Sequence, residues 1–158
     1  MSWPAPVERV SAFLRDAAVD ARVEECEAPT GTAEEAAEAV GCTTAEIVKT
    51  LAFVCDERTS VLALVPGDKR ADERKVAGAA GCAGARLAKP DEVRSATGFD
   101  PGGVSPFPHP PELRVLVDRQ LLGHERVWVA AGSARHVAGL APHDLVRLAH
   151  AEAADLVR

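Results

Sequence analysis

Aromatic side chains are scarce in this sequence, which has no tyrosine, two tryptophans and four phenylalanines among its 158 residues. Small aliphatic side chains must therefore form most of the core. A chain of this length can bury such a core without disulfides or metal ions, and its length fits one domain. We accordingly expect a single domain over residues 1–158.

Long apolar runs are also missing, since none reaches the ~18 residues that are needed to cross a bilayer. The start of the chain, MSWPAPVERV, lacks the basic region followed by an apolar stretch that marks a signal peptide. These absences argue against a membrane as a partner and predict a cytoplasmic protein.

The four cysteines form no C-x-x-C pair, and no cysteine or histidine spacing matches a zinc site. We interpret Cys26, Cys42, Cys55 and Cys82 as reduced thiols, because free cysteine packs like a small hydrophobic residue. The P-loop, dinucleotide-binding and zinc-hydrolase motifs are absent as well. The sequence thus predicts neither a metal nor a cofactor.

Basic residues are fewer than acidic ones. The chain has 18 lysines and arginines and 24 aspartates and glutamates, which gives a formal net charge of −6. A protein that held a duplex only through its phosphates would carry a basic surface. Extensive non-specific binding of nucleic acid is therefore not expected. A small contact with the end of a nucleic acid remains compatible with this charge.

Apolar periodicity, caps and turn residues predict alternating helices and strands, and hence an α/β (α+β) domain with a mixed central sheet. Two S/T-x-x-E capping boxes, at residues 32–35 and 43–46, mark helix starts. The expected helices cover residues 7–18, 32–40, 71–81, 89–98 and 142–153, and the expected strands cover 22–27, 47–54, 60–65, 113–118, 127–132 and 136–140.

Lys49 stands in the middle of an apolar strand, 46-EIVKTLAFV-54. Strand alternation puts it on one face with Ile47, Leu51 and Phe53. Burying an unpaired ammonium costs several kcal/mol, so the group must find a partner or lose its charge. Two interpretations follow: the side chain extends out to solvent, or it points into a pocket toward a phosphate, carboxylate or carbonyl oxygen.

The segment 98-GFDPGGVSPFPHPP-111 concentrates glycine and proline. Glycine lets a ligand approach the main chain closely, and proline stiffens the segment, which is therefore unlike a flexible Gly/Ser linker. It is either a stiff connection between two halves of the sheet or a rigid loop that presents amides and carbonyls to a substrate.

Ser133 follows the strand that ends at Gly132, and His136 lies three residues further on. This pair suggests a hydrolase, but the G-x-S-x-G elbow is missing and no acidic partner is evident. A Gly-Ser contact with substrate, supported by the histidine, fits the pattern better than a nucleophilic pair does.

Five motifs occur in a characteristic order: V-K-T-L, V-L-A-L-V-P-G-D-K-R, T-G-x-x-x-G-G-V-S-P-F, V-x-x-D-x-x-L, and V-W-V-A-A-G-S with a following histidine. Together they resemble the YbaK/EbsC-type aminoacyl-tRNA deacylases, whose relatives include the editing domain of bacterial prolyl-tRNA synthetases. The resemblance covers residues 7–148. It implies a compact YbaK-like domain with a mostly antiparallel, barrel-like mixed sheet and flanking helices.

The activity that this resemblance implies is trans-editing, the hydrolysis of the ester that links a wrong amino acid to tRNA, most often tRNA for proline. The partners would be the acceptor end of the mischarged tRNA and prolyl-tRNA synthetase, and the protein would be a monomer or a weak homodimer. Cysteine, alanine, 2-aminobutyrate, serine and threonine all remain open as the edited amino acid. The alternatives are a binding module of the same fold that does not cleave, and a hydrolase of another ester that uses Ser133.

The resemblance also assigns site residues. Lys49 matches the essential lysine, which would hold the phosphate of the terminal adenosine or a substrate oxygen, and its neighbour Thr50 is expected to contact substrate. The backbone of the glycine–proline loop would line the amino-acid pocket. The loop positions are Gly102, Gly103, Val104, Ser105 and Pro106, and further pocket positions in weaker roles are Asp118, Gly132, Ser133 and His136.

Two departures from the family pattern bear on the substrate. Many relatives have glycine two residues after the loop proline, where this chain has Pro108. Any pocket tyrosine must also be replaced. Both differences predict an altered pocket wall.

Overall fold

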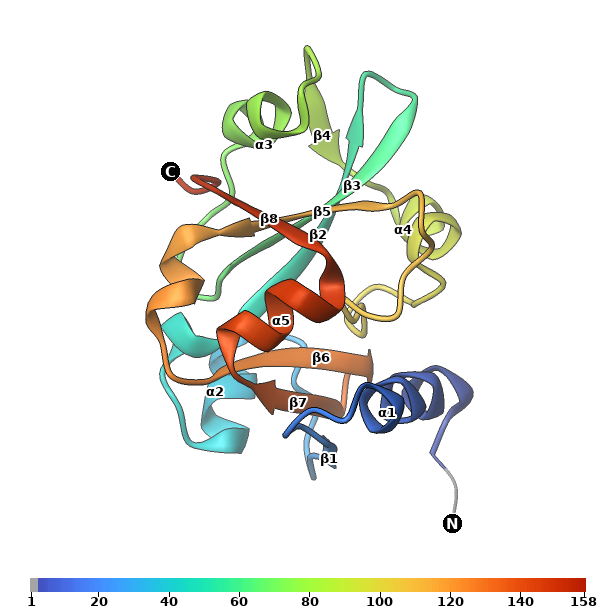
Figure 1. Ribbon diagram of the computed structural model, residues 1–158, viewed down its shortest axis with the longest axis vertical. Helices are drawn as coiled ribbons and strands as arrows, with labels where there is room; N and C mark the ends of the chain where they lie inside the picture. The colour runs from blue at the N-terminus through green and yellow to red at the C-terminus, as the bar shows by residue number, and fades with distance from the viewer. Residues whose placement is uncertain (1–2) are drawn as a thin grey trace.

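The computed structural model describes residues 3–158 and contains two β-sheets (Figure 1). The larger sheet has the strand order β4-β2-β3-β5-β8, and the smaller one has the order β1-β7-β6. The strands are β1 (Val23–Glu25), β2 (Val48–Cys55), β3 (Thr59–Pro66), β4 (Ala85–Leu87), β5 (Arg114–Asp118), β6 (Val127–Ser133), β7 (His136–Leu140) and β8 (Ala151–Ala154).

The larger sheet is mixed, as the sequence predicts. Strands β2 and β3 form an antiparallel hairpin in which Lys49 lies opposite Val65. Strand β5 is parallel to both β3 and β8, whereas the pairs in the smaller sheet are antiparallel. An isolated parallel bridge between Ile47 and Trp128 joins the start of β2 to β6.

The expectation of a barrel-like sheet is wrong. Both sheets are open, since β4 and β8 are the edges of one and β1 and β6 are the edges of the other. The bridge between Ile47 and Trp128 lies outside the named ladders, so within the described residues 3–158 no continuous hydrogen-bonded ring of strands closes.

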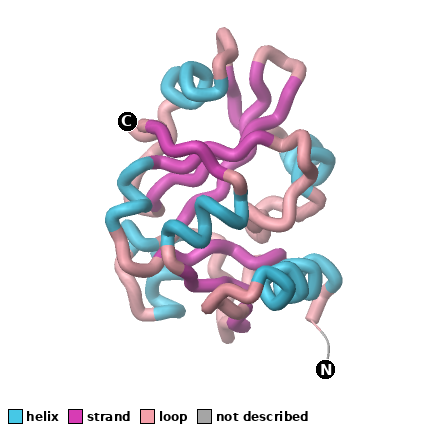
Figure 2. Tube along the Cα trace, viewed as in Figure 1, coloured by secondary structure: helices cyan, strands magenta, loops and turns pink. Residues whose placement is uncertain are grey.

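Five α-helices and two 3₁₀ turns surround the sheets within residues 3–158 (Figures 1 and 2). Helix α1 packs on β6, α3 lies beside β4, and α5 lies beside β8. No helix in this part of the chain is long and apolar enough to cross a membrane. The helices are α1 (Ala5–Ala17), α2 (Ala33–Val40), α3 (Glu73–Ala80), α4 (Pro90–Thr97) and α5 (Pro142–Ala149), and the 3₁₀ turns are η1 (Thr44–Glu46) and η2 (Arg119–Gly123).

The C-terminal segment differs from its prediction. Helix α5 ends at Ala149, because His150 adopts the left-handed conformation with φ of 53°. The next residues, Ala151–Ala154, form β8 by parallel pairing with β5. The expected helix over 142–153 is therefore too long. Alanine and glutamate favour a helix, so only the tertiary pairing makes this segment a strand.

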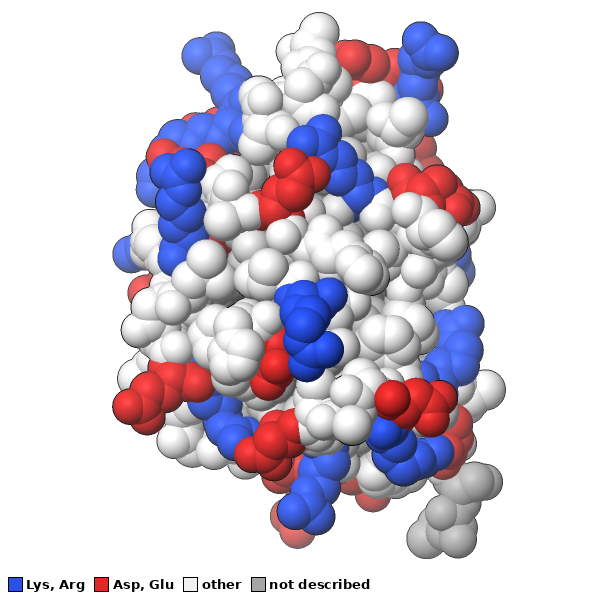
Figure 3. Space-filling model, viewed as in Figure 1, with Lys and Arg blue, Asp and Glu red and all other residues white. Residues whose placement is uncertain are grey.

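Two cores cover the two faces of the larger sheet. Val48 and Ala52 of β2 join the core that contains α1 and α5, whereas Phe53 packs into the core that contains Val76 of α3. Strand alternation along β2 therefore follows the predicted pattern. On the face seen in Figure 3, basic and acidic side chains are interspersed, so this face offers no broad basic surface to a nucleic acid.

Candidate functional site

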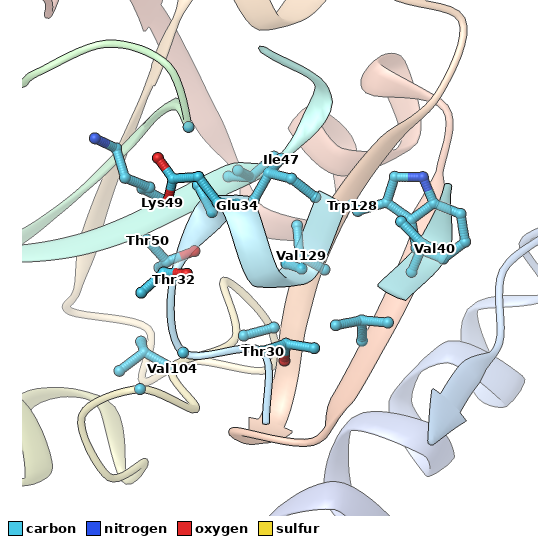
Figure 4. A pocket seen from close by; sticks show the side chains of 18 of the residues that line it. Thr30, Thr32, Glu34, Val40, Ile47, Lys49, Thr50, Val104, Trp128 and Val129 are labelled. Atoms are coloured by element: carbon cyan, nitrogen blue, oxygen red, sulfur yellow. The ribbon is translucent and has the colours of Figure 1, made fainter. Parts of the chain in front are cut away.

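A cavity of about 440 Å³ lies among the start of β2, the start of α2, strand β6 and the glycine–proline loop (Figure 4). This volume is in the range of small-ligand sites. Polar side chains lie on one side, and apolar ones on the other. Its predicted site residues are Lys49, Thr50, Gly102 and Val104, and its other walls include Thr30, Gly31, Thr32, Glu34, Val40, Ile47, Trp128, Val129 and Val137.

Lys49 lines this cavity with a half-buried side chain. Its Nζ donates a hydrogen bond to the carbonyl oxygen of Lys69 in the turn after β3. Burial lowers the pKa of the Lys49 ammonium, and the Arg70 cation lowers it further, whereas the carboxylates of Glu34 and Asp68 raise it. The lysine thus lies at a cavity wall, and a backbone carbonyl satisfies one of its donors.

Thr50 contributes an unsatisfied hydroxyl. Its Oγ1 is buried and has no hydrogen-bond partner within residues 3–158. A buried hydroxyl without a partner costs about 1–3 kcal/mol. A ligand or a water molecule in the adjoining cavity is the natural partner for this oxygen.

The glycine–proline loop reaches the cavity through Gly102 and Val104. Gly103 lies beneath it against β6, where an added Cβ would be 2.7 Å from the backbone nitrogen of Ser133. The amide of Gly132 also donates to the carbonyl oxygen of Gly103 at 3.0 Å. Close approach of two backbones therefore fixes the loop, and this approach requires glycine at 103.

Ser105 and Pro106 are buried and do not line the cavity. The Ser105 hydroxyl donates to the carbonyl oxygen of Phe107 at 2.6 Å, so it holds the shape of the loop. Pro108 lines a different cavity, together with Phe13 and His109. The Pro108 difference from the family pattern therefore lies away from the Lys49 cavity.

Ser133 and His136 contact each other, with the hydroxyl 2.6 Å from Nδ1 of the ring. The Ser133 hydroxyl also accepts from the amide of Arg135 at 2.9 Å. The buried His136 has its Nε2 3.6 Å from a Glu25 carboxylate oxygen. Neither residue lines the Lys49 cavity, so the pair braces the β6–β7 turn behind it.

Gly132 and Asp118 also lie outside the cavity lining. Gly132 has φ of 100°, and an added Cβ would be 2.8 Å from the backbone of Pro6 in α1. Asp118 is buried and accepts from the amides of Gln120 and Leu156 at 2.9 and 2.8 Å. Its carboxylate therefore caps η2 and holds the C-terminal segment.

Two parts of the cavity wall were not predicted from the sequence. Residues 30–34 form one wall, but the capping box explained Thr32 fully as a helix start. Trp128 forms the apolar far side, half-exposed, although the V-W-V motif already contained it. The sequence carried no signal for this role, because a tryptophan in a strand is ordinary and its half-exposure is visible only in the structure.

The side chains that line the cavity form no Ser/His or Cys/His pair. A nucleophile for hydrolysis would therefore come from water or from the substrate. No group of three or more potential metal ligands occurs in residues 3–158. The site provides one cation, one unsatisfied hydroxyl, a rigid backbone loop and an apolar wall.

Comparison with known proteins identifies the family. A profile of the "Aminoacyl-tRNA editing domain" matches residues 27–148. The chain is 35% identical over 125 residues to the protein YwhH of Bacillus subtilis, covering 78% of both chains. It is also 35% identical over 142 residues to the proline–tRNA ligase of Xanthomonas oryzae, which covers 87% of this chain but 25% of that longer enzyme.

Solved structures agree with this assignment. A crystal structure of a candidate trans-editing enzyme for prolyl-tRNA synthetase superposes with a TM-score of 0.91 and 39% identity, over 99% of both chains. A candidate Cys-tRNA(Pro)/Cys-tRNA(Cys) deacylase of Enterococcus faecalis, EbsC, is 26% identical over 125 residues, 79% of this chain and 76% of its own. The chain therefore belongs to the aminoacyl-tRNA editing domain family, a family of ester-hydrolysing deacylases.

Proposed function

We propose that this protein is a trans-editing deacylase that hydrolyses the ester of a mischarged tRNA, namely tRNA for proline carrying cysteine, alanine or another small amino acid. The observation that carries the proposal is the cavity that is lined both by Lys49 and by Gly102 and Val104 of the glycine–proline loop. The similarity to the candidate prolyl-tRNA trans-editing enzyme supports the choice of tRNA.

The chemistry that we propose uses the protein for positioning and charge stabilisation. Attack of a water molecule on the ester carbonyl forms a tetrahedral intermediate with negative charge on the former carbonyl oxygen. Its collapse breaks the bond to the ribose oxygen, which takes up a proton from the water, and releases the free amino acid and the uncharged tRNA. The Lys49 ammonium is the cationic donor in the cavity lining for that role, and the main chain at Gly102 and Val104 lies in the same lining, whereas the Gly103 amide already donates to the carbonyl oxygen of Asp100. To reach a substrate oxygen or phosphate, Lys49 exchanges its bond with the carbonyl oxygen of Lys69 for one with the ligand.

The tRNA contact in this proposal is small. Only the acceptor end enters the cavity, which is consistent with a chain of net charge −6. Thr50 supplies its unpaired hydroxyl to the substrate, while Gly103, Ser105 and Pro106 keep the loop in place. We further propose a single cytoplasmic domain that acts as a monomer or weak homodimer and works beside prolyl-tRNA synthetase.

The apolar wall supports a small side chain as the edited group, because Val40, Ile47 and Trp128 leave a compact space. Discrimination by such a wall is worth only about 1–3 kcal/mol per methylene. The protein is therefore expected to accept several small amino acids with rates that differ by about 10- to 200-fold.

A panel of mischarged tRNAs tests the proposal. Purified protein is incubated with tRNA for proline carrying cysteine, alanine, 2-aminobutyrate, serine or threonine, and with correctly charged prolyl-tRNA. Faster loss of a small amino acid than of proline is the expected result. Tight binding of these tRNAs without any acceleration of ester loss would instead identify a binding module that does not cleave.

A further inference from the structure

The Lys49 cavity has one acidic side chain in its lining, that of Glu34. Glu34 is the second residue of α2, after the Thr32 cap. Its side chain is exposed, and within residues 3–158 this side chain takes part in no hydrogen bond or ion pair. Its neighbour Glu35, by contrast, is engaged in the capping box with Thr32.

Glu34 and Lys49 lie on the same side of the cavity (Figure 4). The Glu34 carboxylate is near enough to raise the pKa of the lysine, against the effect of burial. Within residues 3–158 the two groups form no ion pair, and the lysine donates to the carbonyl oxygen of Lys69. The cavity therefore has a cation and an exposed carboxylate on the same side, and the carboxylate is available to a ligand.

An aminoacyl ester has charges that match this pair. Its α-ammonium is bonded to the carbon next to the ester carbonyl, and the phosphates of the tRNA end are negative. An ammonium has three donors and no acceptor, so a carboxylate is its natural partner. Lysine suits the oxygens of the substrate, and the remaining carboxylate suits its amine.

We infer that Glu34 binds the α-ammonium group of the aminoacyl ester and so selects substrates with a free amine. This inference rests on the proposed function, and it assigns Glu34 a role in substrate binding. It implies that esters whose amine is acylated, such as N-formyl or peptidyl esters, are poor substrates. The site would thereby distinguish an aminoacyl-tRNA with a free amine from a tRNA whose amino acid already carries a formyl group or a peptide.

A simpler explanation for Glu34 is helix stabilisation, since acidic residues in a first turn interact well with the helix dipole. That explanation predicts an effect on α2 alone and none on the choice between free and acylated amines. A substrate pair that differs only in the amine therefore separates the two explanations.

The experiment compares kcat/KM for an alanyl-tRNA and its N-acetyl derivative in three proteins: wild type, Glu34→Gln and Glu38→Gln. Glu38 is the matched control, an exposed glutamate of the same helix that faces a different cavity. We expect Glu34→Gln to lower the free-amine preference about 10-fold or more, the effect of losing one charged hydrogen bond. The fall should come from slower cleavage of the free-amine ester, with the N-acetyl rate and the control unchanged.

An unchanged preference in Glu34→Gln, or an equal loss for both substrates, would overturn the inference. Binding of an uncleavable amide analogue, alanyl-amino-adenosine with a free or acetylated amine, gives a second readout by calorimetry. If wild type cleaves no ester, the proposed hydrolysis fails. In that case, weaker binding of the free-amine analogue alone in Glu34→Gln supports the Glu34 inference, and unchanged binding overturns it.

Discussion

Replacing Gly103 with alanine tests how the glycine–proline loop is held. The φ angle of Gly103 lies outside the left-handed region, so alanine meets no backbone strain there. Its Cβ would however lie 2.7 Å from both N and Cα of Ser133 and 3.0 Å from C of Gly132. These are backbone atoms in a strand, and they cannot rotate away as the end of a side chain could.

The expected cost has two parts. Overpacking of this kind costs about 1–3 kcal/mol. Separation of the loop from β6 also breaks the hydrogen bond from the Gly132 amide to the Gly103 carbonyl oxygen, worth about 1 kcal/mol. We therefore expect Gly103→Ala to lower the free energy of unfolding by about 2–4 kcal/mol. It should also weaken substrate binding, because Gly102 and Val104 move with the loop.

Denaturant unfolding with Gly78→Ala as the matched variant provides the assay. Gly78 lies inside α3, has no atom within 4 Å of an added Cβ, and also has φ outside the left-handed region. Alanine there should stabilise the protein by about 0.5–1 kcal/mol, the difference in helix propensity. A Gly103→Ala protein within about 0.5 kcal/mol of wild type would refute the close packing of loop and strand.

Three further predictions concern single groups. Burial lowers the pKa of Lys49, so its ammonium should lose its charge at a pH below the usual lysine value of 10.5. As the pH rises, binding of an uncleavable substrate analogue should therefore weaken before pH 10.5, and Lys49→Arg should move this loss of binding to a higher pH. A hydrogen bond from Arg86 lowers the pKa of Glu92 to about 2. The difference in the free energy of unfolding between wild type and Glu92→Gln should therefore be fully present above pH 4.5 and vanish as the pH falls toward 2. Denaturant unfolding at several pH values measures it. Ser133→Ala should retain ester hydrolysis while losing about 0.5–1.5 kcal/mol of stability with its turn hydrogen bonds.

Each of these three predictions would be contradicted by a specific result. Binding that is unaffected up to pH 10.5 would show that the charge of Lys49 is not used. A Glu92→Gln difference that stays constant down to pH 2 would contradict the contact with Arg86. Loss of hydrolysis in Ser133→Ala, with a Lys49 variant still active, would make Ser133 the nucleophile of a different esterase.

Local patterns predicted much of the fold. The two capping boxes start α2 and η1, and alternation along β2 sorts its side chains between the two cores. These features depend on neighbours a few residues apart, so the sequence alone can reveal them. The separation into two open sheets and the strand at Ala151–Ala154 depend on distant pairing, and no local pattern encodes them.

In the candidate site, too, some residues were predictable from local sequence and others were not. Lys49 was identifiable because a lysine on an apolar strand face is anomalous, and the Gly102 loop because glycine and proline cluster there. Glu34 and Trp128 gave no such anomaly, since a first-turn glutamate and a strand tryptophan are ordinary. The family resemblance assigned Asp118 to the pocket, and in the structure its carboxylate accepts hydrogen bonds from two backbone amides.

Lys49 is proposed to act on the ester, and the deacylation rate of a Lys49→Ala protein measures that role. Lys69→Ala is the matched control, because it removes a neighbouring, partly exposed charge but keeps the carbonyl oxygen that Lys49 contacts. Loss of one preorganised donor should slow cleavage of mischarged tRNA about 10²- to 10³-fold, with the control near wild type. A folded Lys49→Ala protein that cleaves as fast as wild type would show that Lys49 does not act on the ester.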